Sequence, residues 1–198
     1  MYSSVVNIQG VGVETTVLNT ASSLGSFIEL TMNSSFADMY TNTRPVVGLD
    51  IEWNSSSPNS KVSILQLCSD TRCLIIQLRH LGCIPLPLMR LLACSPGVNF
   101  VGVGITEDVS KLWRDYGIIF EYTAVHELGP LAARVLNKPH LTRAGLAELA
   151  REVVGLNVEK PTSVTRSNWD ATYLSAEQIK YATIDAYASF LIGKRLSG

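Results

Sequence analysis

The stretch "VVGLDIEW", residues 46–53, decides the fold, because it has the pattern of a buried strand and yet carries two acids. Successive side chains of a strand point to opposite faces, so Asp50 and Glu52 point to the same face. A buried carboxylate is costly unless a partner or a metal ion compensates its charge. The stretch therefore predicts a core strand that also contributes to a functional site.

Composition limits what surrounds this strand. The chain has 198 residues, of which 46% are hydrophobic and 17% charged, which is typical of one packed domain. The formal net charge of −1 does not indicate a nucleic-acid partner, although a local basic groove is compatible with it. We find neither an apolar run of membrane-spanning length nor a secretory signal, and the cysteines lack zinc-site spacing. We therefore expect no membrane association and an intracellular location, in the nucleus or the cytoplasm.

Hydrophobic periodicity predicts strands first and then strands that alternate with helices. That order is typical of an α/β sandwich around a mixed sheet. Residues 1–40 are expected to form an N-terminal strand or arm packed on the main domain, 41–198. The predicted strands span 5–18 (one or two), 44–53, 61–68, 72–78 and 99–105, and the predicted helices span 23–40 (weakly), 85–93, 108–115, 127–136, 143–156 and 175–196.

Two further acids occur where core elements meet. Asp108 follows the apolar strand at 99–105, and Asp185 lies in the last helix, four residues after Tyr181 and on the same helix face. Each acid has a structural alternative: Asp108 as an acid of a first helical turn, Asp185 as an exposed helix acid, Glu52 as the partner of a lysine. Carboxylates that converge at one end of a sheet would instead bind divalent cations such as Mg²⁺.

Three segments, in this order, resemble a known family: "VVGLDIEW" with "KVSILQLC", then "FVGVGITEDVSKL", then "SNWDATYLSAEQIKYATIDAYASFLIG". They are similar to the motifs of DnaQ-like 3′–5′ exonuclease domains of the DEDDy class, in the ribonuclease H-like superfamily. The resemblance is greatest to Werner syndrome-like exonucleases and short single-domain plant proteins, and it covers residues 44–196. It implies a ribonuclease H-like mixed sheet of five to six strands, flanked by helices on both faces, with residues 41–198 as the exonuclease domain.

The resemblance also implies a catalytic site. Asp50, Glu52, Asp108 and Asp185 match the four metal-binding carboxylates, and Tyr181 matches the tyrosine of the class. By analogy, two Mg²⁺ or Mn²⁺ ions would be held there, with Asp50 between them, Asp108 acting through water, and Tyr181 positioning the attacking water. The substrate would be nucleic acid with a single-stranded or recessed 3′ end, and the products nucleoside 5′-monophosphates.

Three further residues are candidates for contacts with the substrate. Lys160 and Arg166 are candidates for phosphate contacts, with a solvated surface as the alternative, and Trp169 either stacks on a base or anchors a turn. Homo-oligomerisation and protein partners for targeting are compatible with the sequence.

Two other functions are considered. One is a ribonuclease H-type endonuclease, which the tyrosine segment argues against. The other is a catalytically weak binding or scaffold protein on a nuclease fold, which the intact acids argue against.

Overall fold

The computed structural model describes residues 1–24, 28, 45–54, 59–94 and 97–197. Its described strands form one seven-stranded sheet in the order β1-β2-β5-β4-β3-β6-β7. Most of the helix expected at 23–40, and the boundary expected near residue 40, lie outside the described residues. The strands are β1 (Tyr2–Ile8), β2 (Val11–Leu18), β3 (Val46–Trp53), β4 (Val62–Ser69), β5 (Arg72–Ile76), β6 (Asn99–Gly102) and β7 (Val125–Glu127).

The strand pairing makes the sheet mixed, as predicted. β3, β4 and β5 form an antiparallel meander, while β3 pairs with β6, and β6 with β7, in parallel. β1 and β2 form an antiparallel hairpin that joins the sheet through parallel pairing of β2 with β5. The sheet has one strand more than the expected five to six, because β7, only three residues long, is too short to show a period.

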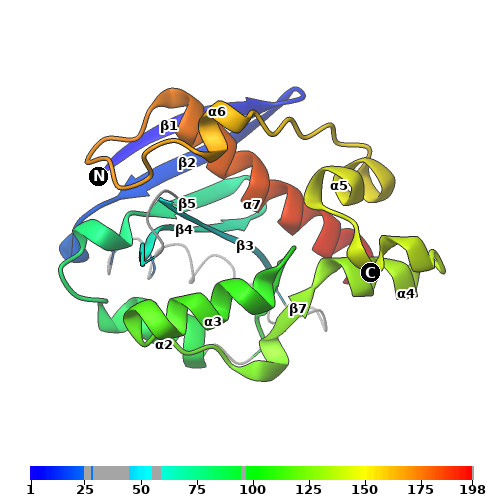
Figure 1. Ribbon diagram of the computed structural model, residues 1–198, viewed down its shortest axis with the longest axis horizontal. Helices are drawn as coiled ribbons and strands as arrows, with labels where there is room; N and C mark the ends of the chain where they lie inside the picture. Colours follow the sequence, from blue (N-terminus) through cyan, green and yellow to red (C-terminus); the bar gives the residue numbers. More distant parts are fainter. Residues whose placement is uncertain (25–27, 29–44, 55–58, 95–96, 198) are drawn as a thin grey trace.

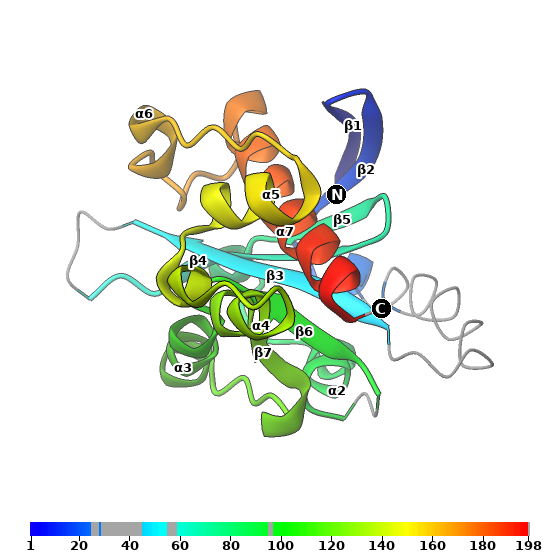
Figure 2. The same cartoon turned by 90° about the vertical axis from the view of Figure 1, so that its right-hand side faces the viewer.

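Helices cover both faces of the sheet, which confirms the predicted layers (Figures 1 and 2). One apolar cluster joins α4, α5 and α7 to one face, and a second joins α2 and α3 to the other. Among the described residues, none of the helices is both long and apolar enough to cross a bilayer. The helices are α2 (Leu86–Cys94), α3 (Ile105–Tyr116), α4 (Leu128–Val135), α5 (Leu146–Val154), α6 (Thr162–Thr165) and α7 (Ala176–Ser197).

The start of α7 is set by a capping box. The backbone N–H of Gln178 donates to Oγ of Ser175 at 3.2 Å, and the N–H of Ser175 donates to Oε1 of Gln178 at 2.9 Å. Each side chain thus satisfies a backbone donor that the first helical turn leaves free. Ser175 is therefore the N-cap, and the capping box fixes where Tyr181 and Asp185 fall along the helix.

Helix α7 crosses directly over β3 because Gly48 has no side chain. A Cβ atom at Gly48 would lie 2.0 Å from the carbonyl oxygen of Ala186 and 2.5 Å from the nitrogen of Phe190. A glycine in a strand interior often marks such a close backbone approach. The contact places the acids of β3 next to Asp185 of α7.

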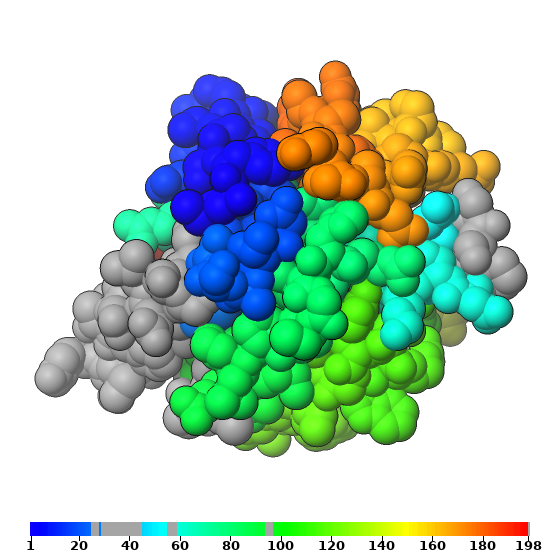
Figure 3. Space-filling model, turned by 90° about the vertical axis from the view of Figure 1, so that its left-hand side faces the viewer, coloured from blue at the N-terminus to red at the C-terminus, as the bar shows by residue number. Residues whose placement is uncertain are grey.

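The N-terminal hairpin packs against the same helix. Oγ1 of Thr15, on β2, lies 3.0 Å from Oγ1 of Thr183 on α7, and both side chains are buried. Val6 and Ile8 of β1 belong to the same apolar cluster as Leu174. Figure 3 shows the hairpin, in dark blue, beside the orange segment that leads into α7. The hairpin therefore supports the helix that carries Tyr181 and Asp185.

Candidate active site

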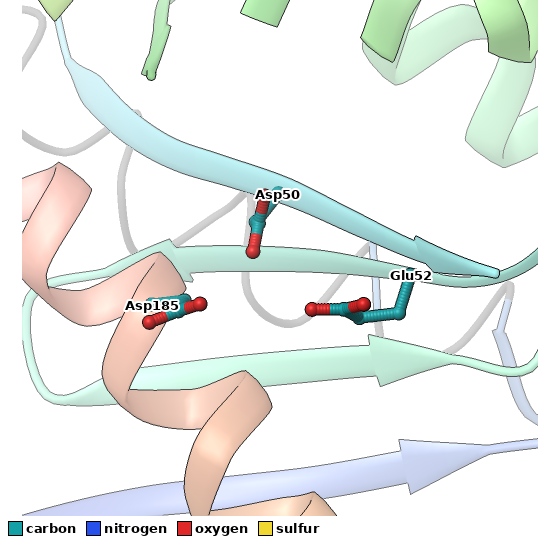
Figure 4. Close-up of side chains that lie close together, drawn as sticks. All are labelled: Asp50, Glu52 and Asp185. Carbon is teal, nitrogen blue, oxygen red and sulfur yellow. The ribbon is translucent and has the colours of Figure 1, made fainter. Parts of the chain in front are cut away.

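Three of the four predicted acids converge beside the strand β3. Asp50 and Glu52 point from β3 toward Asp185 on α7 (Figure 4). One carboxylate oxygen from each residue lies within 4.8 Å of the others. The even spacing of the two strand acids puts both on the face that α7 covers, while Leu49 and Ile51 pack into the opposite core. Local strand geometry and the close crossing at Gly48 together create the cluster.

Asp108 lies outside this cluster of three. Helix α3 begins at Ile105, earlier than the predicted residue 108, so Asp108 lies in its first turn. The preceding Gly104 adopts a left-handed conformation, and its N–H donates to Oε1 of Glu127 at 2.7 Å. The charge of Asp108 nevertheless raises the pKa values of both Asp50 and Glu52. The position of Asp108 is compatible with a contact to a metal ion through water. It is also compatible with the structural alternative, in which the positive end of the helix dipole stabilises an acid in the first turn.

The gathered acids repel one another and are poorly solvated. Burial, and then the charges of Asp185, Glu52 and Asp108, raise the pKa of Asp50 well above its usual value. Burial and the charge of Asp185 raise the pKa of Glu52 to about 8. Burial and the charges of Glu127 and Glu107 raise the pKa of Asp108 to about 7. Burial and mutual repulsion therefore disfavour the charged forms of these carboxyl groups.

The surroundings of the Asp185 carboxylate show whether a divalent cation fits this site. The side chain of Asp185 is only 1% exposed. Its Oδ1 is buried and has no hydrogen-bond partner among the described residues. A buried carboxylate oxygen without a donor is unfavourable, whereas an oxygen-rich cluster of this kind is what Mg²⁺ and Mn²⁺ prefer. The residues present therefore fit a divalent cation.

A lysine and a tyrosine complete the site. The Nζ atom of Lys160 lies 2.7 Å from Oδ2 of Asp185 and 3.5 Å from the hydroxyl of Tyr181, to which it donates. Burial and the charge of Asp185 raise the pKa of Tyr181 to about 12, so its hydroxyl stays protonated. The sequence makes Lys160 a candidate for a phosphate contact, with a solvated surface as the alternative; in the structure it pairs with a predicted metal ligand, and the phosphate contact stays a prediction. No local sequence pattern indicates this pairing, because 25 residues separate Lys160 from Asp185.

The other two predicted substrate contacts lie elsewhere. Trp169 is 1% exposed, donates from Nε1 to the carbonyl of Thr165 at 3.1 Å and packs 6.0 Å from the ring of Tyr181. The predicted stacking of Trp169 on a base is therefore wrong, because protein encloses its ring. Trp169 instead anchors the local chain, which is the alternative that the sequence offered. Arg166 is exposed just after α6, and its phosphate contact remains a prediction.

Two supporting residues were missed from the sequence. Gly48 lies inside the quoted strand, and its position in a strand interior was the available signal. Glu127 comes from β7, a strand that itself went unrecognised, and it holds the start of α3 through Gly104. No sequence pattern could have linked Glu127 to Asp108.

A hollow of about 520 Å³ adjoins the site at Tyr181. It lies between the turn of the N-terminal hairpin, the segment from Asn157 to Val164, and one face of α7. Its lining includes side-chain amides from Asn7, Gln9 and Asn157 as well as Lys180. This space is large enough to count as a ligand cleft.

Comparison with known proteins agrees with the fold. The family model described as 3′-5′ exonuclease matches residues 16–197, so the chain belongs to the 3′–5′ exonuclease family. A 3′-5′ exonuclease of Arabidopsis thaliana is 37% identical over 155 residues, which cover 76% of this chain and 52% of that protein. The mouse bifunctional 3′-5′ exonuclease/ATP-dependent helicase WRN is 32% identical over 76% of this chain and 11% of its own length. The chain thus spans about half, or less, of these two relatives.

Solved structures extend the comparison to the fold. The EXD2 exonuclease domain soaked in Mn is 30% identical, with a TM-score of 0.53 over 92% of this chain and 88% of that one. The same domain soaked in Mg and GMP gives 29% identity and a TM-score of 0.54 over the same shares. Escherichia coli RNase D, at 21% identity, gives a TM-score of 0.74 over 92% of this chain and 44% of its own. The predicted ribonuclease H-like fold and the resemblance to Werner syndrome-like exonucleases are confirmed.

Proposed function

We propose that this chain is a metal-dependent 3′–5′ exonuclease that shortens nucleic acid from a single-stranded or recessed 3′ end and releases nucleoside 5′-monophosphates. The observation that carries the proposal is the cluster of Asp50, Glu52 and Asp185, whose carboxylate oxygens lie within 4.8 Å of one another. Membership of the 3′–5′ exonuclease family supports the direction of attack. The Mn and Mg soaks of the EXD2 domain support the choice of metal ions.

Each residue has a role in this proposal. Asp50, Glu52 and Asp185 would hold the ion that activates water, and Asp50 and Asp108 would contribute to holding a second ion. Two bound ions would supply an activated water and charge stabilisation for the leaving oxygen. The Tyr181 hydroxyl orients the attacking water by hydrogen bonding, a role for which a protonated phenol is suited.

The surroundings hold the tyrosine in place for that role. The buried ring of Trp169 packs against Tyr181 from one side, and the ammonium of Lys160 lies 5.4 Å from its ring centroid. Preorganised groups of this kind avoid the cost of reorientation during the reaction. The hollow beside Tyr181 supports the proposal, because it offers space next to the tyrosine that the end of a nucleic-acid strand would enter.

The test compares matched 5′-labelled DNA and RNA strands, each with a free or a blocked 3′ end, in Mn²⁺, in Mg²⁺ and in a chelator. We expect a ladder that shortens from the free 3′ end, with nucleoside 5′-monophosphate as product and no hydrolysis in the chelator. The Asp50→Asn variant serves as the inactive control. The DNA and RNA arms identify the substrate class.

Two outcomes would overturn the proposal in different ways. Cleavage of a circular single strand, or internal fragments from a strand with a blocked 3′ end, would indicate a ribonuclease H-type endonuclease. Tight binding of the strands without hydrolysis in either metal would indicate the binding or scaffold protein that the sequence left open.

A further inference from the structure

The ammonium of Lys160 lies beside the carboxylate cluster of Asp50, Glu52 and Asp185. Its Nζ atom is 2.7 Å from Oδ2 of Asp185 and 3.5 Å from the hydroxyl of Tyr181. Lys160 reaches this position from the segment between α5 and α6, whereas both partners belong to α7. The ammonium of Lys160 therefore occupies part of the space beside Asp185, which is a predicted metal ligand.

This ion pair differs from an ordinary surface pair. The side chain of Asp185 is 1% exposed and that of Lys160 is 39% exposed. In the surface pair of Lys138 with Glu152, at 2.9 Å, the exposed fractions are 44% and 33%. A buried carboxylate requires compensation of its charge, whereas an exposed pair gains little from its contact. Lys160 therefore supplies charge that the buried acid needs.

The lysine also acts on the other two acids. Its charge lowers the pKa values of Asp50 and Glu52, against the larger raising effects of burial and neighbouring carboxylates. Bound divalent ions would supply the same compensation with a higher charge. Two cations that neutralise the same carboxylates oppose each other, so metal binding weakens the hold of Asp185 on Lys160.

We propose that Lys160 is an internal counter-ion that competes with the metal ions for Asp185 and, once they are bound, turns to the phosphate of the substrate. This inference rests on the proposed function. The lysine has a flexible four-carbon side chain and a partly exposed position, so its ammonium can move without backbone change. Its contact with Tyr181 keeps it on the side of the site where the reacting phosphate would lie.

The competition predicts opposite changes in two affinities. Calorimetric titration of the full chain with Mn²⁺ alone should give an apparent Kd about tenfold lower for Lys160→Met than for the parent protein, equivalent to 1.4 kcal/mol. Titration with a nucleoside 5′-monophosphate at saturating Mn²⁺ should give a Kd about tenfold higher for the same variant. Lys160→Arg keeps the charge and should stay close to the parent protein in both titrations.

The matched control is Lys138→Met, which removes a lysine from an exposed ion pair of similar length that includes none of the site residues. It should leave both affinities unchanged. A purely structural role for Lys160 predicts the reverse of the first result, because a misplaced Asp185 would bind Mn²⁺ more weakly. Unchanged or weaker Mn²⁺ binding by Lys160→Met therefore overturns the inference.

A measurement on the parent protein keeps the inference testable if Lys160→Met does not fold. In metal-free protein, the side-chain ammonium NMR signal of Lys160, assigned by its loss in Lys160→Arg, should be protected from exchange. Saturating Mg²⁺ should shift or remove that signal and leave the signal of Lys138 unchanged. A Lys160 signal that Mg²⁺ does not affect overturns the inference. Failure of the parent protein to bind Mn²⁺, together with no hydrolysis in the strand assay, overturns the proposed function instead.

Discussion

Replacement of Gly48 by alanine tests whether the contact between β3 and α7 builds the site. The added Cβ would lie 2.0 Å from the carbonyl oxygen of Ala186, about 1.4 Å short of the 3.4 Å at which ordinary contact begins. The second clash, at 2.5 Å, is with the backbone nitrogen of Phe190. Neither atom belongs to a side chain that can turn away. Helix α7 must therefore move off the strand by more than an ångström.

The shift has two measurable consequences. Overpacking of a core costs about 1–3 kcal/mol of unfolding free energy, and a backbone clash on both sides places Gly48→Ala near the upper end. For a chain of this length, that corresponds to a Tm lower by about 6–12 °C. Because Ala186 follows Asp185 directly, the acid moves away from Asp50. A displacement of about 1 Å at a reacting centre can cost about 100-fold in rate.

The assays are thermal unfolding, Mn²⁺ titration and the strand assay, with Gly145→Ala as control. Gly145 has an ordinary φ of −76°, and a Cβ there would meet nothing within 4 Å. Its replacement should change the unfolding free energy by less than about 1 kcal/mol. A Gly48→Ala protein with the parent Tm, Mn²⁺ affinity and rate would refute the reasoning.

Three further predictions concern the site itself. Asp50→Asn should abolish hydrolysis while circular dichroism shows an intact fold. The reason is that loss of one metal ligand removes several kcal/mol of transition-state stabilisation. A folded variant that keeps a tenth of the parent rate would contradict the assignment. Tyr181→Phe should slow turnover by about 10²–10⁴-fold yet keep the parent Mn²⁺ affinity in calorimetry, and full activity would reduce the tyrosine to a packing role. Burial raises the pKa of Glu52 from 4.5 to about 8, so this carboxyl group contributes stability at low pH that is lost as the pH rises toward 8. In chelator, Glu52→Gln should therefore gain in Tm relative to the parent protein across this range, and a constant difference would show that Glu52 titrates normally.

Local sequence determined much of this protein. The alternation of "VVGLDIEW" placed Asp50 and Glu52 on one face of a core strand, because side-chain direction in a strand depends only on the backbone. The spacing of Tyr181 and Asp185 placed them on one face of a helix for the same reason. The cap at Ser175 was also readable, since it depends on residues three apart. Periodicity likewise indicated the meander and the helices that cover the sheet.

Contacts between distant segments were decided only by the tertiary structure. The ion pair of Lys160 with Asp185, the enclosure of Trp169 and the hydrogen bond from Gly104 to Glu127 each join residues whose neighbours carry no mark of the partner. Such contacts depend on how elements pack and on which polar groups burial leaves in need of a partner. The sequence by itself therefore determined which acids face the site, whereas only the packing of α7 on β3 decided how closely they meet and which cation of the chain compensates them.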